Sequence, residues 1–266
     1  MKNNSKKKYV FSQIMDKCPK ARTFLLKKGY SFDETTKQMF LKADLAGNVA
    51  TLMYFDVLKQ EQLTLHITKG NHKLGKIPSV AVSPWITCQG KLCHDCGTCY
   101  GLHGRFLSFI KFYYMVENTV LLQKHPEEFK AQIKAYFGKH PDVSIFRWFE
   151  NGDFPDVESV ALFDEIAKEN KKTAFICMTK QYDKVNKYLE VTGGKYSKNL
   201  KLRFSKFEID GLTMCDNPYD LPLTDVINSK EELHEGAFLC PGTSVGCSKC
   251  KACAYTNKEI NFEKQN

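Results

Sequence analysis

Eight of the eleven cysteines lie in two short groups, and each group follows a segment that reads as a buried strand. The first group is Cys88-x4-Cys93-x2-Cys96-x2-Cys99, and the second is Cys240-x6-Cys247-x2-Cys250-x2-Cys253. Two residues between cysteines allow both sulfur atoms to turn toward one point, so each group can surround a metal ion or an iron–sulfur cluster. Two such groups, about 150 residues apart, predict a fold that holds metal on its loops.

The cysteines are best interpreted as metal ligands in a reducing compartment. Met1 to Lys8 is polar and basic with no apolar stretch behind it, which is unlike a secretory signal. No apolar run approaches the roughly 20 residues that span a membrane, so no membrane partner is expected. We therefore predict a cytoplasmic protein, and in the cytoplasm disulfides are rare.

The net charge of +9 permits an anionic partner, such as a nucleic acid or a nucleotide. The basic residues are scattered along the chain, which is typical of a solvated surface. Charge alone therefore leaves the partner open.

The first 68 residues predict an extension of helix and β-hairpin. Residues 9–32 read as helical with a break at Pro19. The runs 49–58 and 63–67 are rich in strand-forming residues and are joined by a short polar turn, which predicts a hairpin. We place a domain boundary here, with the extension over 1–68 and a cysteine-rich α/β domain over 69–266.

After this boundary, strands and helices alternate. Helical spacing of apolar residues predicts long helices over 105–124 and 126–138. The expected strands are 76–82, 143–149, 173–178, 200–204 and 237–239. This rhythm predicts the α/β class: a parallel sheet like a partial (βα) barrel, with the N-terminal extension and a cysteine-rich C-terminal loop.

Chemically distinctive residues follow five of the expected strands. They are the first cysteine group, Gly152-Asp153, Thr179-Lys180, Ser205-Lys206 and the second cysteine group. Loops at the carboxyl ends of parallel strands share one edge of the sheet, so these residues are expected to converge.

The spacing leaves the metal open between iron–sulfur clusters and zinc. Three or four thiols in one short run favour a [4Fe–4S] cluster, because structural zinc more often uses two separated pairs. The second group offers four sulfurs to one cluster. In the first group Cys96 is either a fourth ligand or a spare, and a spare would leave one iron open to a small molecule.

The remaining candidates lie between the two cysteine groups. Asp153, Lys180 and Lys206 are the candidate catalytic residues, although Asp153 or Asp156 can instead cap the next helix and either lysine can be solvated. Arg147 and Trp148 alternate within a strand, so they face opposite sides of the sheet. A charged side chain on a buried face needs a partner, which marks Arg147 for attention.

Several motifs resemble the phage "gene product 88" family. They are Gly70-Asn-His-Lys-Leu-Gly75, Thr87-Cys88, Cys93, Cys99-Tyr100, Arg147-Trp148 with Gly152-Asp153, Thr179-Lys180, and the second cysteine group beginning at Cys240-Pro241. The resemblance covers about residues 68–256. It implies a phage or mobile-element origin, and hence the host cytoplasm, but it names no reaction.

The plan is also similar, more distantly, to the radical S-adenosylmethionine superfamily. There a three-cysteine loop follows the first barrel strand, and a Gly-Gly-Glu-like loop after the next strand holds the methionine amine. This similarity implies that Tyr100, Glu150, Gly152 and Asp153 bind the cofactor. The first group departs from the usual pattern, because its first two cysteines are separated by four residues instead of three.

Together these observations predict an iron–sulfur protein with one or two [4Fe–4S] clusters, and zinc as the alternative. The predicted function is a radical S-adenosylmethionine-like enzyme acting on a nucleotide or nucleic acid. The alternatives are a nucleic-acid-binding module braced by metal, and an electron-transfer or redox-sensing protein.

Overall fold

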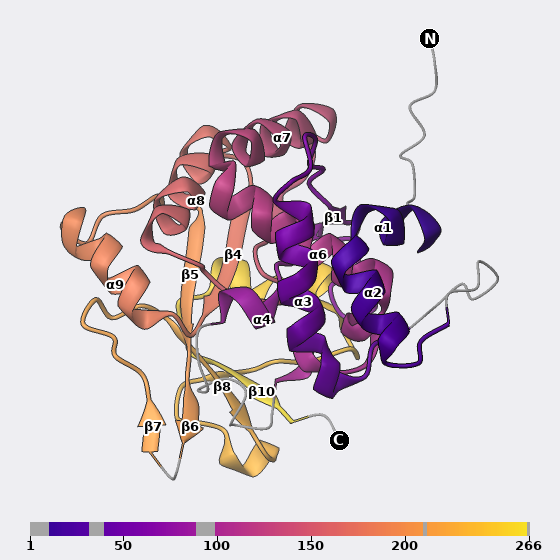
Figure 1. Cartoon of the computed structure of the whole chain (residues 1–266). Helices are drawn as coiled ribbons and strands as arrows, with labels where there is room; N and C mark the ends of the chain where they lie inside the picture. The colour runs from indigo at the N-terminus through magenta and orange to yellow at the C-terminus, as the bar shows by residue number, and fades with distance from the viewer. Residues whose placement is uncertain (1–10, 32–39, 89–98, 210–211, 265–266) are drawn as a thin grey trace.

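An open eight-stranded sheet forms the centre of the computed structural model, which describes residues 11–31, 40–88, 99–209 and 212–264 (Figure 1). The strand order is β1-β2-β3-β4-β5-β8-β10-β9. The strands are β1 (Ile67–Thr68), β2 (Ser79–Val80), β3 (Ile145–Arg147), β4 (Ala174–Thr179), β5 (Leu200–Ser205), β8 (Leu223–Ile227), β9 (Phe238–Leu239) and β10 (Ile260–Glu263). All neighbours pair in parallel except β1 with β2. The predicted α/β class with a parallel sheet is confirmed, and the sheet is not a closed barrel.

The helices and a separate two-stranded sheet connect these strands. That small sheet pairs β6 (Phe207–Ile209) with β7 (Leu212–Met214). The helices are α1 (Phe11–Lys17), α2 (Pro19–Lys27), α3 (Ala43–Val57), α4 (Pro84–Thr87), α6 (Phe109–Lys124), α7 (Pro126–Lys139), α8 (Val157–Glu169), α9 (Tyr182–Val191), α10 (Cys247–Cys250) and α11 (Ala252–Tyr255). Short 3-10 turns span Tyr100–Leu102, Gly104–Leu107 and Lys230–Glu232. The long helices predicted after residue 105 are confirmed.

The direction of winding decides what covers each face of the sheet. From β2 to β5 and on to β8 each strand is added on the same side of the previous one, so right-handed crossovers put their helices on one face. We call this the helix face. The last crossover, from β9 to β10, runs back toward the middle of the sheet. The same handedness therefore puts the cysteine-bearing segment between them on the opposite, open face.

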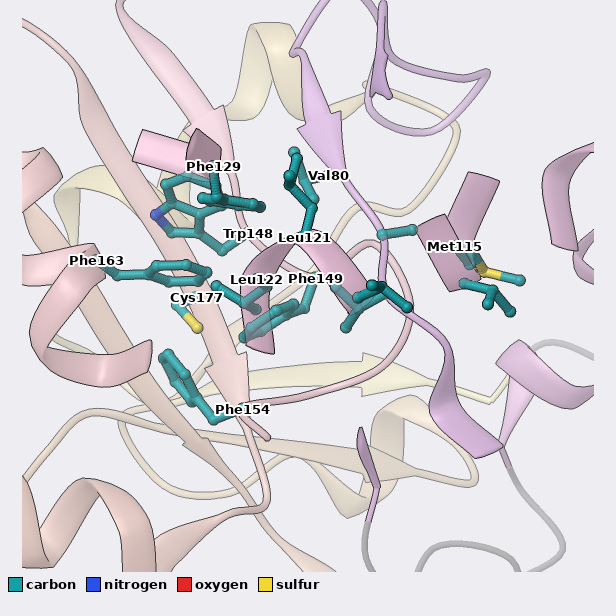
Figure 2. Close-up of a cluster of buried hydrophobic side chains, with 14 of the residues drawn as sticks. Val80, Met115, Leu121, Leu122, Phe129, Trp148, Phe149, Phe154, Phe163 and Cys177 are labelled. Carbon is teal, nitrogen blue, oxygen red and sulfur yellow. The ribbon is translucent and has the colours of Figure 1, made fainter. Parts of the chain in front are cut away.

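The helix face holds the main core. Trp148 is fully buried and stacks on Phe163 with ring centroids 4.0 Å apart. Phe129 of α7 lies beside both rings (Figure 2). Phe146 and Phe175 complete this aromatic layer from β3 and β4. Because side chains alternate along a strand, Arg147 faces the other side, as predicted.

The open face carries a second, smaller apolar cluster. Ile145 of β3 and Ile176 of β4 pack there with Leu74, Ile77 and Ala254. Ala254 lies in α11, so the C-terminal segment covers β3 and β4 on this side. In Figure 1 the segment, coloured yellow, lies behind β4.

The predicted N-terminal β-hairpin is wrong. Residues 43–57 form α3, and the second run leads into the two-residue β1, which pairs with β2 and not with the first run. The reason is periodicity: Ala46, Val49, Ala50, Met53 and Val57 are buried at helical spacing. A helix that packs on α6 buries all five side chains on one face, whereas a strand would turn about half of them to the opposite face.

The domain boundary at residue 68 stays a prediction. The apolar side chains of α1 to α3 belong to the same hydrophobic core as the helix face, as Ile14 and Met53 show. The predicted helix over 9–32 with a break at Pro19 is confirmed by α1 and α2 over the residues that the structure describes.

Candidate metal centre

The four cysteines of the second group surround one cavity on the open face. Cys240 follows β9, Cys247 and Cys250 begin and end α10, and Cys253 lies in α11. Two features of the backbone make this tight turn. Gly246 precedes α10 with a φ of 75°, and Lys251 adopts the left-handed conformation between the two short helices. The structure thus brings all four cysteines of the second group to one cavity, and their role as metal ligands stays a prediction.

The donor set of this cavity bears on which metal it fits. Cys240, Cys247, Cys250 and Cys253 all lie in the described part of the chain, and together they supply four thiols. Zinc binds four thiolates tetrahedrally, and a [4Fe–4S] cluster binds one thiolate on each iron atom. The four thiols therefore suit either group, and the choice between them stays a prediction.

The Gly70–Gly75 loop forms one wall of the cavity. Asn71 Oδ1 accepts the backbone N–H groups of Lys73 and Leu74, at 2.9 Å each, and Leu74 lines the cavity. The carbonyl of Lys73 accepts the Cys247 N–H at 2.8 Å. Gly75 lies so close to Ser248 that a Cβ at this position would overlap the Ser248 hydroxyl. This motif, which carries part of the family resemblance, thus holds α10 in place.

Two arginines lie beside the cysteines on the open face. Arg147 of β3 lines the cavity. Arg203 of β5 is 2% exposed and donates to the backbone carbonyls of Cys253 (3.3 Å), Thr256 and Lys258 (2.9 Å). Arg147 could be picked out from the sequence, but Arg203 could not. The reversed last crossover decides which face of β5 the cysteine segment covers, and that crossover leaves no local signal.

The electrostatics of the cavity combine burial with positive charge. Burial raises the pKa of Cys253 to about 11, while Arg147 and Arg203 oppose the shift. Burial likewise raises the pKa of Cys247, opposed by Arg147 and Lys73. Such thiols stay protonated at neutral pH unless a metal takes the place of the proton. Metal binding here would therefore release protons and weaken as the pH falls.

The first cysteine group is only partly described. Cys88 follows α4 and Cys99 precedes the 3-10 turn that Tyr100 begins, and both thiols are half-buried. Cys93 and Cys96 lie outside the described residues, so the spare cysteine and the meeting of the two groups stay predictions.

The predicted convergence of loops holds at the carboxyl ends of β2, β3 and β4. Asn151 donates to the carbonyl of Gly101 at 3.0 Å, just after the first cysteine group. The Thr87 hydroxyl, which comes before that group, accepts the N–H of Asp153 at 3.1 Å. Gly152 has a φ of 78°, and a Cβ there would overlap Val82. Thr179, which ends β4, donates to Asp153 at 2.6 Å, so the loops after β2, β3 and β4 are in contact.

Glu150 binds two cations and an amide in this region. Its carboxylate accepts from Asn71 (2.8 Å), Lys111 (2.9 Å) and Arg105 (3.3 Å). Burial raises the pKa of Glu150, but Lys111, Asn71 and Arg105 outweigh it and leave the pKa below the usual 4.5. Through Asn71, Glu150 also holds the loop that supports Cys247.

Asp153 is buried and bound by internal donors. It accepts from the hydroxyl of Thr179 (2.6 Å) and from the N–H groups of Lys180 and Phe154 (2.8 Å each). Burial raises the pKa of Asp153 and these donors oppose the shift. The helix cap is Asp156, whose carboxylate accepts the Ser159 N–H at 2.8 Å. The cofactor-binding and catalytic roles of Glu150, Gly152, Asp153 and Lys180 stay predictions.

Lys206 belongs to a separate cluster that sequence analysis did not identify. Its ammonium binds both oxygens of Glu259, at 3.0 and 3.2 Å. Glu259 also binds His234 Nδ1 at 2.6 Å, and the other ring nitrogen faces Asp225 at 3.8 Å. These residues come from four segments that only the tertiary fold brings together. The cluster links β5, β8 and β10, and the catalytic role of Lys206 stays a prediction.

Fold and site define an α/β protein with a cysteine-lined centre on the open face of its sheet. A family model described as "Gene product 88" matches residues 56–233, and the chain belongs to this family. The predicted family is thereby confirmed, although the match ends before Cys240. Neither the curated proteins nor the solved structures include a match to this chain. The similarity to radical S-adenosylmethionine proteins gains no support from these comparisons.

Among the described residues, no helix is both long and apolar enough to cross a membrane. The cytoplasmic location stays a prediction.

Proposed function

We propose that this chain is an iron–sulfur protein whose second cysteine group holds a [4Fe–4S] cluster. The observation that carries the proposal is that Cys240, Cys247, Cys250 and Cys253 line one cavity, three of them from a single short run of the chain, which is typical of cluster ligation. The neighbouring Arg147 and Arg203 add support, because four thiolates around a cluster carry net negative charge. Zinc is the alternative outcome of the test below.

The four ligands give this site the chemistry of electron transfer or of structural bracing. With four cysteines available, every iron of one cubane has a protein ligand, so no iron is left for a substrate. Arg147 and Arg203 offset the charge of the centre. Leu74, Ile77 and Ile176 limit the access of water to it.

The test is metal analysis after anaerobic reconstitution with ferrous iron and sulfide. We expect about four iron and four sulfide per chain from the second site, with more if the first group also binds a cluster. Cys250→Ser should lower the iron content, whereas the matched control Cys215→Ser, outside both groups, should not. A colourless protein with stoichiometric zinc and no iron would refute the proposal, as would an unchanged iron content in Cys250→Ser.

A radical S-adenosylmethionine-like activity on a nucleotide or nucleic acid is a proposal for the first group. It is motivated by the loops that meet around Thr87, Gly101 and Asn151 at the carboxyl edge of the sheet. We expect the reduced protein to form 5′-deoxyadenosine from S-adenosylmethionine, and Cys99→Ser to form none. The absence of product from the wild type would leave the electron-transfer and nucleic-acid-binding alternatives. Binding to DNA or RNA that weakens steeply with salt would favour the latter.

A further inference from the structure

Arg203 is a buried cation without an ionic partner in the described part of the chain. Its side chain leaves β5 on the open face, and its three hydrogen bonds all go to backbone carbonyls of residues 253, 256 and 258. No described carboxylate lies within ion-pair distance of its guanidinium, although Tyr196 and Cys253 are close enough to affect its pKa. A guanidinium buried in this way is costly unless negative charge compensates it.

The three carbonyls show what Arg203 does for the backbone. One belongs to Cys253 in α11, and the other two, of Thr256 and Lys258, belong to the turn that leaves α11 and leads to β10. The planar guanidinium spreads its donors over this turn, which a lysine ammonium at a single point does not reproduce. Arg203 therefore fixes the position of Cys253 from the open face of the sheet.

The nearest source of negative charge is the cysteine centre itself. Cys253 is the residue whose carbonyl Arg203 binds, and its thiol influences the guanidinium. A cluster with four thiolates is net negative and becomes more so on reduction. The charge of the Arg203 guanidinium would therefore stabilise a bound cluster, and it would stabilise the reduced cluster more than the oxidised one.

We infer that Arg203 is a positioning residue of the metal centre, which both anchors the turn after Cys253 and sets the reduction potential through its charge. This inference rests on the proposed iron–sulfur function. It concerns two separable properties, since the hydrogen bonds act on geometry and the charge acts on potential.

Two substitutions separate these properties. Arg203→Lys keeps the charge and loses the set of hydrogen bonds, whereas Arg203→Met loses both. Arg22→Met, which removes an exposed positive charge from α2, is the matched control. Each reconstituted full-length variant is measured for iron and sulfide content, for the rate of iron loss to a chelator, and for its reduction potential by dye-mediated titration.

We expect both Arg203 variants to lose iron about tenfold faster than wild type, as for other residues that orient metal ligands. The potential should shift to more negative values in Arg203→Met and stay near wild type in Arg203→Lys and Arg22→Met. If Arg203→Met does not fold, the rate of iron loss from Arg203→Lys still tests whether Arg203 anchors the metal centre. Wild-type iron retention in Arg203→Lys, or equal potentials in Arg203→Met and Arg22→Met, would overturn the inference. If the reconstituted wild-type protein binds no iron, the proposed function is refuted, and the inference about Arg203 is refuted with it.

Discussion

Replacing Gly75 by alanine should destabilise the protein through two separate effects. Gly75 has a φ of 64°, a left-handed conformation that costs an alanine about 1–2 kcal/mol. Its new Cβ would also overlap Ser248 Oγ and lie 3.0 Å from Ser248 Cβ. Forcing a methyl group into such a packed contact costs about 1–3 kcal/mol. We therefore expect a loss of about 2–5 kcal/mol in the free energy of unfolding.

Two other glycines give matched controls. Gly193 has a φ of 60°, and a Cβ added there would meet no atom within 4 Å, so Gly193→Ala isolates the backbone strain. Gly138 lies in α7 with neither strain nor contact, so Gly138→Ala should stabilise the protein by about 0.5–1 kcal/mol. Urea unfolding of the three variants, prepared anaerobically in the same way, gives the comparison.

A double variant tests the steric part directly. Ser248→Ala removes the overlapping hydroxyl, so adding it to Gly75→Ala should recover about 1 kcal/mol while the backbone strain remains. Because Ser248 lies between Cys247 and Cys250 in α10, Gly75→Ala should also speed the loss of iron. The reasoning is refuted if Gly75→Ala is no less stable than Gly193→Ala.

Two further predictions concern the carboxyl edge of the sheet and the main core. The lowered pKa of Glu150 means that its stabilisation is present above pH 4.5 and is lost as the pH falls through the folded-state pKa. Glu150→Gln should therefore lower the Tm at pH 7 and flatten its decline below pH 4.5, and equal acid profiles would contradict this. Trp148→Ala should cost about 3–5 kcal/mol because it empties the centre of the aromatic layer. Trp148→Phe should cost much less, since it also removes an indole N–H that has no partner among the described residues, and equal losses in urea unfolding would argue against this account.

The βα part of the fold could be predicted because its elements are long and strongly periodic. The helices at 105–124 and 126–138 carry apolar residues at helical spacing, and the strand at 173–178 is a short apolar run, too short for a buried helix and buried almost throughout. Residues 49–58 carry strand-forming residues on a helical repeat, and burial against α6 decided in favour of the helix. Short strands such as β8 and β10 depend on their neighbours and leave little local signal.

The cysteines of the candidate site could be picked out from the sequence, but their surroundings could not. The CxxC spacing of Cys247, Cys250 and Cys253 is a local property, and the structure brings these residues to one cavity. The role of Arg203 depends on which face the last crossover covers, and the role of Gly75 depends on its contact with Ser248. Neither follows from spacing along the chain.

The reversed crossover also has a consequence for synthesis on the ribosome. In the described part of the chain, β9 pairs only with β10, which is inserted between β9 and β8. Residues 260–263 must therefore leave the exit tunnel before the cysteine segment can be closed against the sheet. Until then its thiols are open to oxidation and to competing metals. A metal held by the proposed centre would therefore be enclosed only after β10 has paired with β8 and β9.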